Sequence, residues 1–240
     1  MKYSYYKTSI LYLSIVLILV SCEKEIDPLE KAKSVFNNSN YLSYQTEAYY
    51  PMPNSNMSRK VITNTEYLID STDPIGFQYS WKSKGLDKVY KDGELSLVSH
   101  KINTIRILQT KQFKDSSKFN NVVKNSFVRR KWTPIGLMEH EDWKYVRDSI
   151  FDNIHLTDYS RIASVGLNGE VKIITEQHIF VDDEGFIKRL ERRVLNDGQV
   201  KQSVIFNFSD YKTNKGEIEY QVPTDYALEY GKPQTDTSKK

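Results

Sequence analysis

The fold of this chain is decided by a stretch in its first half, Ile75-Gly76-Phe77-Gln78-Tyr79-Ser80-Trp81-Lys82. Large apolar side chains alternate here with small or polar ones, and a period of two is the spacing of a β-strand with one buried face. Three aromatic side chains, Phe77, Tyr79 and Trp81, therefore share one face of the predicted strand. Other elements must cover this apolar face, and the rest of the chain supplies them.

The period of two extends on both sides of this stretch, over residues 41 to about 108. A weaker alternation over residues 61–69 predicts a neighbouring strand that carries Tyr67. The pair Asp92-Gly93 predicts a hairpin turn between two further strands. We therefore predict five or six antiparallel strands in this part of the chain.

Helical spacing replaces the strand pattern in the middle of the chain. One helix face is formed by Phe119, Val122, Val123 and Phe127, after the capping candidates Asp115 and Ser116. A break at residues 132–136 follows. A second, shorter helix over about residues 138–149 is predicted because it would bring together Trp143, Val146 and Ile150.

The last third returns to strands that are separated by well-marked turns. The turn pairs are Asn168-Gly169, Glu184-Gly185 and Asp197-Gly198. One apolar face of the last long strand is expected to carry Val200, Val204, Phe206 and Phe208. This pattern predicts a meander with one solvated face, followed from residue 223 by a frayed polar tail.

A helix is also predicted before the first strand. Asp27 is a candidate cap and Pro28 suits a first helical turn. Its apolar face would carry Leu29, Ala32, Val35 and Phe36, and the polar run 37–40 would end it.

The first 22 residues have the layout of a secretory signal. Lys2 and Lys7 precede an uncharged apolar run over residues 10–20, and Ser21 stands before Cys22, the single cysteine. The run is too short to span a bilayer core of about 30 Å as a stable helix. The alternatives are an ordinary signal peptide with an incidental cysteine, or an uncleaved anchor.

Residues 19–22 resemble the lipobox of bacterial lipoproteins. That resemblance implies cleavage before Cys22 and acylation of its sulfur and new amine, so Cys22 is the predicted lipidation site and membrane anchor. Several acyl chains anchor firmly, since each buried methylene contributes roughly 0.8 kcal/mol. We expect a signal peptide at 1–21, a lipidated tether at 22–26, one domain at 27–222 and a polar tail at 223–240. The expected location is the outer membrane, facing either the periplasm or the exterior.

Composition excludes some classes of function. Loss of Lys2 and Lys7 with the leader lowers the formal net charge from +3 by two, to +1, which gives no reason to expect nucleic-acid binding. With Cys22 acylated, no disulfide or thiolate nucleophile remains. The length suits one large domain with a sizeable core, and 17 tyrosines favour β-structure.

The order of helix, strands, helical insertion and strands resembles the lipoprotein carriers of the LolA/LolB type. It is also similar to the lipid-anchored domain that precedes thioredoxin domains in some envelope lipoproteins, through residues 73–77, 178–189 and 208–212. The resemblance implies an α+β fold, a strongly curved antiparallel sheet or incomplete barrel with helices on its concave face, and a cavity for acyl chains. No Cys-x-x-Cys or thioredoxin domain follows, so no disulfide chemistry is implied. The rival architecture is a flat two-layer sandwich.

Local catalytic motifs and zinc-ligand spacings are absent from the sequence. A metal site from distant segments, or paired carboxylates for glycoside hydrolysis, would be brought together only by the fold, so they stay open here. The four histidines, His100, His140, His155 and His178, lie apart and lack zinc spacing. The run 139–142 is expected to be a solvated helix start, and 182–185 a hairpin turn rather than a calcium loop. No nucleophile elbow or phosphate loop occurs. We therefore predict a protein that is not an enzyme and has no cofactor.

The candidate ligand-binding residues are Tyr67, Phe77, Tyr79 and Trp81. They either form core or line an apolar cavity that takes an acyl chain or a lipoprotein. A structural or partner-docking lipoprotein with a filled core is the alternative, and an enzyme is the third hypothesis. A basic group splits between two strand faces and comprises Lys188, Arg189, Arg192 and Arg193. With Glu191 between them, it is expected to be a solvated, ion-paired surface rather than an anion site.

Overall fold

A computed structural model describes residues 26–52, 57–113, 115–127, 132–168 and 171–230. The predicted leader, Cys22 and most of the tether lie outside these residues. None of the helices within them has the length and apolar character that crossing a membrane requires.

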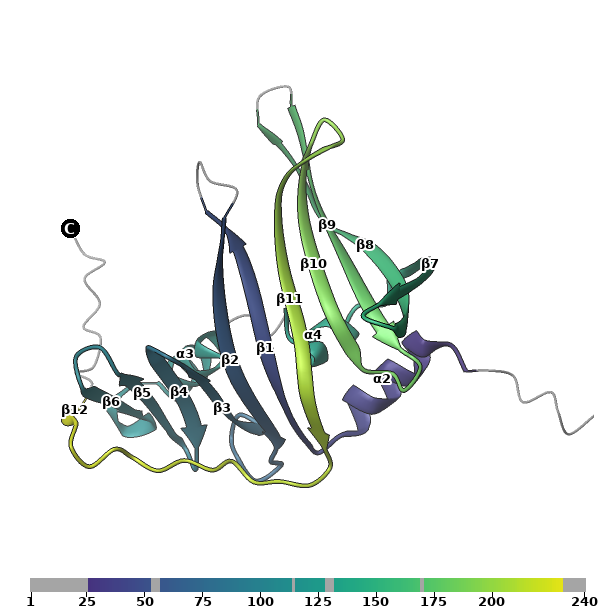
Figure 1. The fold of residues 1–240 in the computed structure, drawn as a ribbon. Helices are drawn as coiled ribbons and strands as arrows, with labels where there is room; N and C mark the ends of the chain where they lie inside the picture. Colours follow the sequence, from purple (N-terminus) through teal and green to yellow (C-terminus); the bar gives the residue numbers. More distant parts are fainter. Residues whose placement is uncertain (1–25, 53–56, 114, 128–131, 169–170, 231–240) are drawn as a thin grey trace, which may run out of the picture.

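One sheet of twelve strands organises the described residues (Figure 1). Its order is β12-β6-β5-β4-β3-β2-β1-β11-β10-β9-β8-β7. All neighbours pair antiparallel except β12 and β6, which pair parallel. The predicted class, a largely antiparallel sheet with few helices, is confirmed. The strong curvature of the sheet stays a prediction.

The strands of the first half are β1 (Tyr41–Pro51), β2 (Ser58–Ile69), β3 (Phe77–Ser83), β4 (Leu86–Lys91), β5 (Glu94–Ser99) and β6 (Thr104–Gln109). The strands of the second half are β7 (Lys144–Phe151), β8 (Ile154–Asn168), β9 (Val171–Asp182), β10 (Ile187–Asn196), β11 (Gln199–Thr213) and β12 (Ala227–Tyr230). The helices are α2 (Pro28–Asn38), the 3-10 turn η1 (Thr110–Gln112), α3 (Ser116–Ser126) and α4 (Pro134–Met138). Five or six strands were predicted in this part of the chain, and the structure has six.

Helix α2 forms as its sequence predicts. The Asp27 carboxylate accepts a hydrogen bond from the backbone N–H of Leu29 at 3.1 Å and caps the first turn. The phenol of Tyr159 on β8 also donates to this carboxylate, so the cap is tied to the sheet. Leu29, Ala32 and Phe36 are buried on the face toward the sheet.

Helix α3 is also confirmed, with Asp115 as its cap and with Phe119 and Val123 buried. The second predicted helix in the middle of the chain, over residues 138–149, is wrong, and so is the predicted helix start at residues 139–142. Residues 134–138 form α4, with Pro134 in its first turn and Thr133 as its cap, and residues 144–151 form strand β7. The helical spacing of Val146 and Ile150 was coincidental, because both side chains are exposed.

The turn at Asp152-Asn153 explains why residues 144–151 form a strand. Both residues have positive φ angles, 49° and 62°, as a two-residue hairpin requires. The turn folds β7 back along β8. Pairing with β8 satisfies backbone hydrogen-bonding groups of β7, so the strand forms although it has no buried apolar face. Asn and Asp adopt such angles at low cost, but no glycine marks this turn in the sequence.

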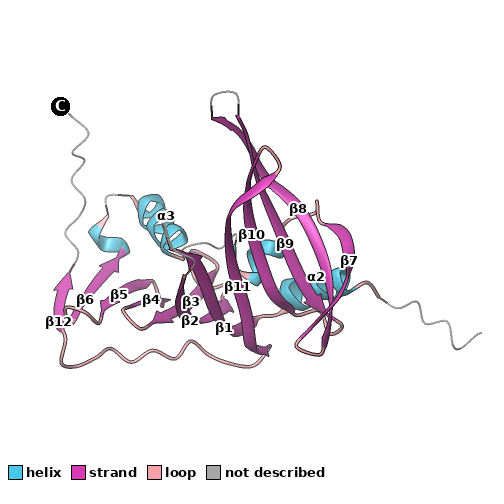
Figure 2. Cartoon of the chain, turned by 45° about the horizontal axis from the view of Figure 1, so that its top comes forward, coloured by secondary structure: helices cyan, strands magenta, loops and turns pink. Residues whose placement is uncertain are grey.

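The three α-helices lie on one face of the sheet, here called the helical face (Figure 2). Two hydrophobic cores form on this face. The α2 core lies between α2, α4 and strands β1 and β8–β11; it includes Leu29, Ala32, Phe36, Leu137, Met138, Trp143, Ile179, Val181, Leu190, Phe206 and Phe208. The α3 core lies between α3 and strands β2–β5 and contains Tyr67, Ile75, Phe77, Tyr79, Tyr90, Leu95, Phe119, Val123 and Phe127.

The segment 214–226 crosses the opposite, outer face of β3–β5 and is here called the strap. Lys82 and Lys91 donate to strap carbonyls at Glu219 and Ile218, each at 3.0 Å. After the strap, β12 adds a parallel strand to β6 (Figure 1). The prediction of a frayed tail from residue 223 is therefore wrong for Ala227–Tyr230, where backbone pairing orders residues that have no buried side chains.

The predicted turns at Glu184-Gly185 and Asp197-Gly198 join β9 to β10 and β10 to β11. Asp182 accepts backbone N–H bonds from Glu184 and Phe186, so its carboxylate shapes a hairpin turn, as the sequence predicts. On β11, Val204, Phe206 and Phe208 are buried, whereas Val200 is 54% exposed. Val200 lies at the hairpin end of the strand, next to the turn.

Candidate functional site

A cavity of about 660 Å³ lies on the helical face between the two cores. Its lining consists of Tyr44, Thr46, Ala48, Tyr50, Pro51, Met52, Arg59, Val61, Thr63, Thr65, Trp81, Lys88, Phe127, Trp132, Thr133, Phe206 and Phe208. Seven of these seventeen side chains are aromatic rings. The cavity is therefore a largely apolar site with a few polar groups.

The floor of the cavity is the central strand pair, β1 and β2. Antiparallel pairing sets Thr46 opposite Thr63 and Ala48 opposite Val61, and alternation turns all four side chains to the helical face. These side chains are small. Large rings stand on both sides, with Trp81 on β3 and Phe206 on β11. The cavity exists because the small floor leaves a hollow between taller neighbours.

The helices leave this floor uncovered. Helix α3 ends at Ser126 and α4 begins at Pro134, so neither spans the central pair. Phe127 and Trp132, which flank the gap between these helices in the sequence, both line the cavity. The cavity therefore lies at the centre of the sheet, between the part covered by α3 and the part covered by α2 and α4.

The two ends of the cavity differ. Pro51, Met52 and Arg59 are exposed, so the cavity opens at the hairpin end of β1 and β2. At the inner end, Tyr44 and Thr65 are buried. Burial raises the pKa of the Tyr44 phenol well above its usual range, while hydrogen bonds with Thr65 and Thr133 oppose that shift. The inner end therefore carries a neutral, hydrogen-bonded phenol.

The charged side chains of the lining have one sign. Arg59 and Lys88 are both cationic, and no aspartate or glutamate is found among the lining residues that the structure describes. The Lys88 ammonium lies 5.7 Å from the centre of the Trp81 ring and donates to the Ser126 carbonyl at 3.4 Å. The cavity is thus apolar with a positive bias.

The four predicted ligand residues fall into two groups. Trp81 lines the cavity. Tyr67, Phe77 and Tyr79 lie in the α3 core beside it, where Phe127 covers Tyr67 and Tyr79 at centroid distances of 5.7 and 4.7 Å. All four share the helical face, as their parity predicts, but Phe127 is the ring that reaches the cavity from this cluster.

Sequence reasoning missed most of the lining. Thr63 and Thr65 lie in a stretch that was recognised as a strand, and their small size on a buried face was the available signal. Trp132 and Thr133 lie where a break was expected. Phe206 and Phe208 were predicted on a buried face, but alternation in the sequence does not indicate that they border a cavity.

A second hollow, of about 790 Å³, lies between the strap and the outer face of β3 and β4. Its lining includes Lys82, Asp87, Lys91, Glu217 and Glu219. Charges of both signs meet here and two of the lysines already bind the strap. This hollow is a polar surface feature that fixes the strap.

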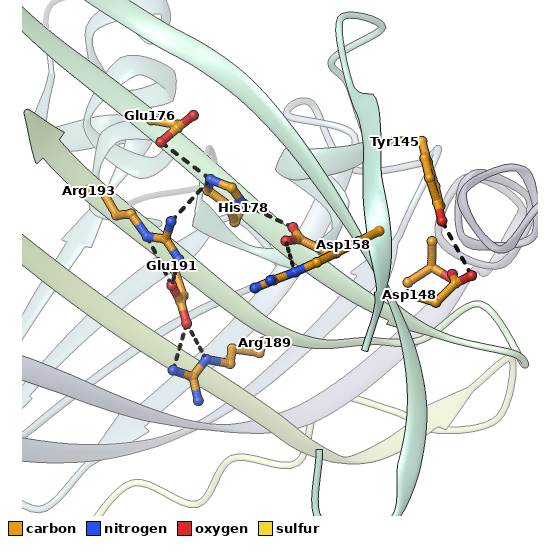
Figure 3. A network of polar contacts seen from close by, with 10 residues as sticks. Tyr145, Asp148, Asp158, Glu176, His178, Arg189, Glu191 and Arg193 are labelled. Atoms are coloured by element: carbon orange, nitrogen blue, oxygen red, sulfur yellow. Dashed lines mark hydrogen bonds and ion pairs between the residues drawn. The ribbon is translucent and has the colours of Figure 1, made fainter. Parts of the chain in front are cut away.

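A histidine with several polar partners, His178, lies on the outer face of β8–β10 (Figure 3). The His178 Nδ1 and an Asp158 carboxylate oxygen are 2.9 Å apart, and Nε2 lies 3.3 Å from Glu176. The hydrogen bond to Asp158 raises the pKa of His178, and burial opposes this. Both ring nitrogens of His178 therefore have acidic partners, and the imidazole is part of an outer-face polar network.

Glu191 completes this network by pairing with Arg189 and Arg193 on the same strand face. The salt bridges lower the pKa of Glu191 against the opposing effect of burial. Arg189 and Arg193 are therefore ion-paired, as predicted, and Lys188 pairs with Asp182 at 3.0 Å. Arg192 lies instead over the Trp132 ring. Among the described residues, no group of three or more His, Cys, Asp or Glu side chains is placed to hold a metal ion.

Comparisons with known proteins find distant structural similarity. No family model and no curated protein matches the chain. An uncharacterized conserved protein from Thermus thermophilus is 10% identical, with 85% of this chain and 97% of that chain covered and a TM-score of 0.44. The Mycobacterium tuberculosis lipoprotein LppX is 8% identical, with 79% and 94% covered and a TM-score of 0.38.

A LolA superfamily protein from Nitrosomonas europaea is 12% identical, with 79% of this chain and 93% of that chain covered and a TM-score of 0.29. At such TM-scores, no residue role is transferred from these proteins to this chain.

Proposed function

We propose that this chain is a lipid-anchored envelope lipoprotein that binds an apolar ligand, an acyl chain or the acyl part of a lipoprotein, in the cavity between its two cores. The observation that carries the proposal is the cavity itself. Its volume of about 660 Å³ falls within the range of about 300–1,000 Å³ that is usual for small-molecule sites. The protein acts by binding and performs no chemistry on the ligand.

The aromatic lining supports an apolar ligand. Phe127, Trp132 and Phe206 present ring surface to a space that opens to solvent at one end. An acyl chain that filled this space would remove its methylenes from water. Ten methylenes would contribute roughly 8 kcal/mol before the costs of ordering the chain.

The anchor is part of the proposal. Acylation of Cys22 would place the described domain next to a membrane, where acyl-bearing ligands are found. Incorporation of radiolabelled palmitate that is lost in Cys22→Ala tests this part, and a protein that is never labelled would contradict it.

Saturable binding of a fluorescent fatty-acid analogue tests the cavity. We expect binding at micromolar concentration or tighter, and we expect Trp81→Ala to weaken it about tenfold, because this ring lines the cavity. Trp143→Ala is the matched control, since Trp143 is buried in the α2 core away from the lining. Circular dichroism checks that both variants are folded. If Trp143→Ala does not fold, the milder substitution Trp143→Phe serves as the control.

A partner-docking lipoprotein is the second candidate, and one observation favours it. Edge strand β7 exposes apolar side chains, with Tyr145 61%, Ile150 77% and Phe151 46% exposed. An unpaired edge with such residues is a typical protein-binding surface. A folded chain without saturable fatty-acid binding, or equal losses in Trp81→Ala and Trp143→Ala, would favour docking over ligand binding.

A further inference from the structure

The charge of the cavity lining suggests the chemical class of its ligand. The described lining carries two cationic side chains, Arg59 and Lys88, and no carboxylate. Low-dielectric walls strengthen the field of such charges inside a cleft. A ligand that enters this cavity therefore meets positive potential together with apolar surface.

Lys88 is already engaged by the protein. Its ammonium donates to the carbonyl of Ser126, the last residue of α3, at 3.4 Å and lies over the Trp81 ring. A cation suits this position, because the carbonyl end of a helix is partially negative. Lys88 thus holds α3 against β3 and β4.

Arg59 lies at the other end of the cavity, at its open mouth. Its side chain is exposed beside Pro51 and Met52, and it forms no ion pair or hydrogen bond with any of the residues that the structure describes. The next residue provides a contrast. Lys60 points to the outer face, where its ammonium binds Glu47 at 2.7 Å.

Resting on the proposed function, we infer that the ligand is an anionic amphiphile that enters chain first and leaves a carboxylate or phosphate head group at Arg59. A guanidinium binds either group through two parallel hydrogen bonds. The part of β2 between Arg59 and Thr65 spans about 20 Å at the ordinary rise of a strand, so a long acyl chain can lie along the floor.

The polar groups of the floor agree with this orientation. Thr46 and Thr63 face each other in the middle of the cavity, and neither hydroxyl forms a hydrogen bond with a described side chain. Neutral hydroxyls on the floor are compatible with an apolar chain, and the other cation of the lining, Lys88, already donates to the Ser126 carbonyl. The single uncompensated cation at the mouth is therefore where the head group binds.

Competition with the fluorescent fatty-acid analogue tests the inference on the full-length chain carrying Cys22→Ala, which keeps the acyl chains of the anchor out of the cavity. The competitors are palmitate, hexadecyl phosphate and hexadecanol, which share a sixteen-carbon chain. We expect the two anions to bind about tenfold tighter than the alcohol, the size of effect that one charge-assisted pair supplies. Comparison of palmitate with hexadecyl phosphate distinguishes the two head groups.

Two neighbouring variants provide the residue test. Arg59→Gln should remove the preference for the anions, so that palmitate, hexadecyl phosphate and hexadecanol compete at similar concentrations, whereas Lys60→Gln should behave as the parent chain. Equal affinity of the parent for palmitate and hexadecanol, or equal effects of Arg59→Gln and Lys60→Gln, would overturn the inference and leave the proposed function standing. A folded chain that binds none of the three competitors would overturn both.

Discussion

The two cores of the helical face are closed in different ways. The α2 core is covered by two helices and filled largely by aliphatic side chains, so that Ile179, Val181 and Leu190 are fully buried. The α3 core is covered by one helix and filled by rings, among which Tyr67 stacks on Phe77 at 5.3 Å. The cavity lies where these two kinds of cover meet, on a floor of threonine and alanine.

The comparison shows how one sheet can have both a sealed and an open part. Under α2 and α4, the aliphatic side chains Ile179, Val181 and Leu190 pack densely and are fully buried. At the edge of the same core, Tyr44, Ala48, Phe206 and Phe208 line the cavity. Rings are rigid and cannot spread into the space above small neighbours. The central strand pair therefore stays open between two well-packed halves.

The largest expected effect comes from making the same truncation in both cores. Leu190→Ala should cost about 4 kcal/mol of unfolding free energy, because Leu190 is fully buried in the α2 core. Leu97 packs against the α3 core but is only half-buried, so Leu97→Ala should cost about 2 kcal/mol. Chemical denaturation measures both, and equal costs would contradict the expectation that the burial of each leucine sets its cost.

A smaller effect is expected at the contact that brings α2 onto the sheet. Gly185 has a φ of 89°, and a Cβ added there would lie 2.7 Å from the backbone carbon of Lys31 in α2. Gly185→Ala should therefore cost about 3 kcal/mol, as strain and overlap add. Gly198, with a φ of 77° and open space around it, is the matched control.

Gly198→Ala should cost about 1 kcal/mol, from backbone strain alone. Thermal unfolding of both variants and of the parent chain measures the stability that each substitution costs. If Gly198→Ala were as unstable as Gly185→Ala, the close approach of α2 would not be the reason that residue 185 must be glycine.

The smallest effect is the pH dependence of the outer-face network. The hydrogen bond to Asp158 raises the pKa of His178 above its unfolded value of about 6.5. The stability that this provides is fully present below the unfolded pKa and is lost as the pH rises through the folded pKa. The parent should therefore exceed His178→Gln in stability by more at pH 6 than at pH 9, by denaturation at each pH.

Neighbouring charges enter this pH test, because Glu176 and Arg193 act on His178 in opposite directions. A difference between parent and His178→Gln that is the same at both pH values would contradict the assignment. Fatty-acid binding should be unaffected in this variant, since His178 lies on the face opposite the cavity.

The elements that the sequence predicted correctly have short-range causes. The alternation around Tyr79, the caps Asp27 and Asp115 and the Asp92-Gly93 turn depend on a few consecutive residues. The failures have long-range causes. Residues 144–151 became a strand because β8 offered a partner, and residues 227–230 joined the sheet because β6 had a free edge.

The sequence by itself therefore determined the class of the fold, the face on which Trp81 lies and, through residues 19–22, the prediction of a lipid anchor at Cys22. Tertiary structure alone decided where the cavity lies. Its floor and walls come from segments as distant as Thr46 and Phe206, and a hollow is what remains after all of them have packed. Local patterns specify which side chains face inward, but the volume left between them depends on the size of every neighbour across the sheet.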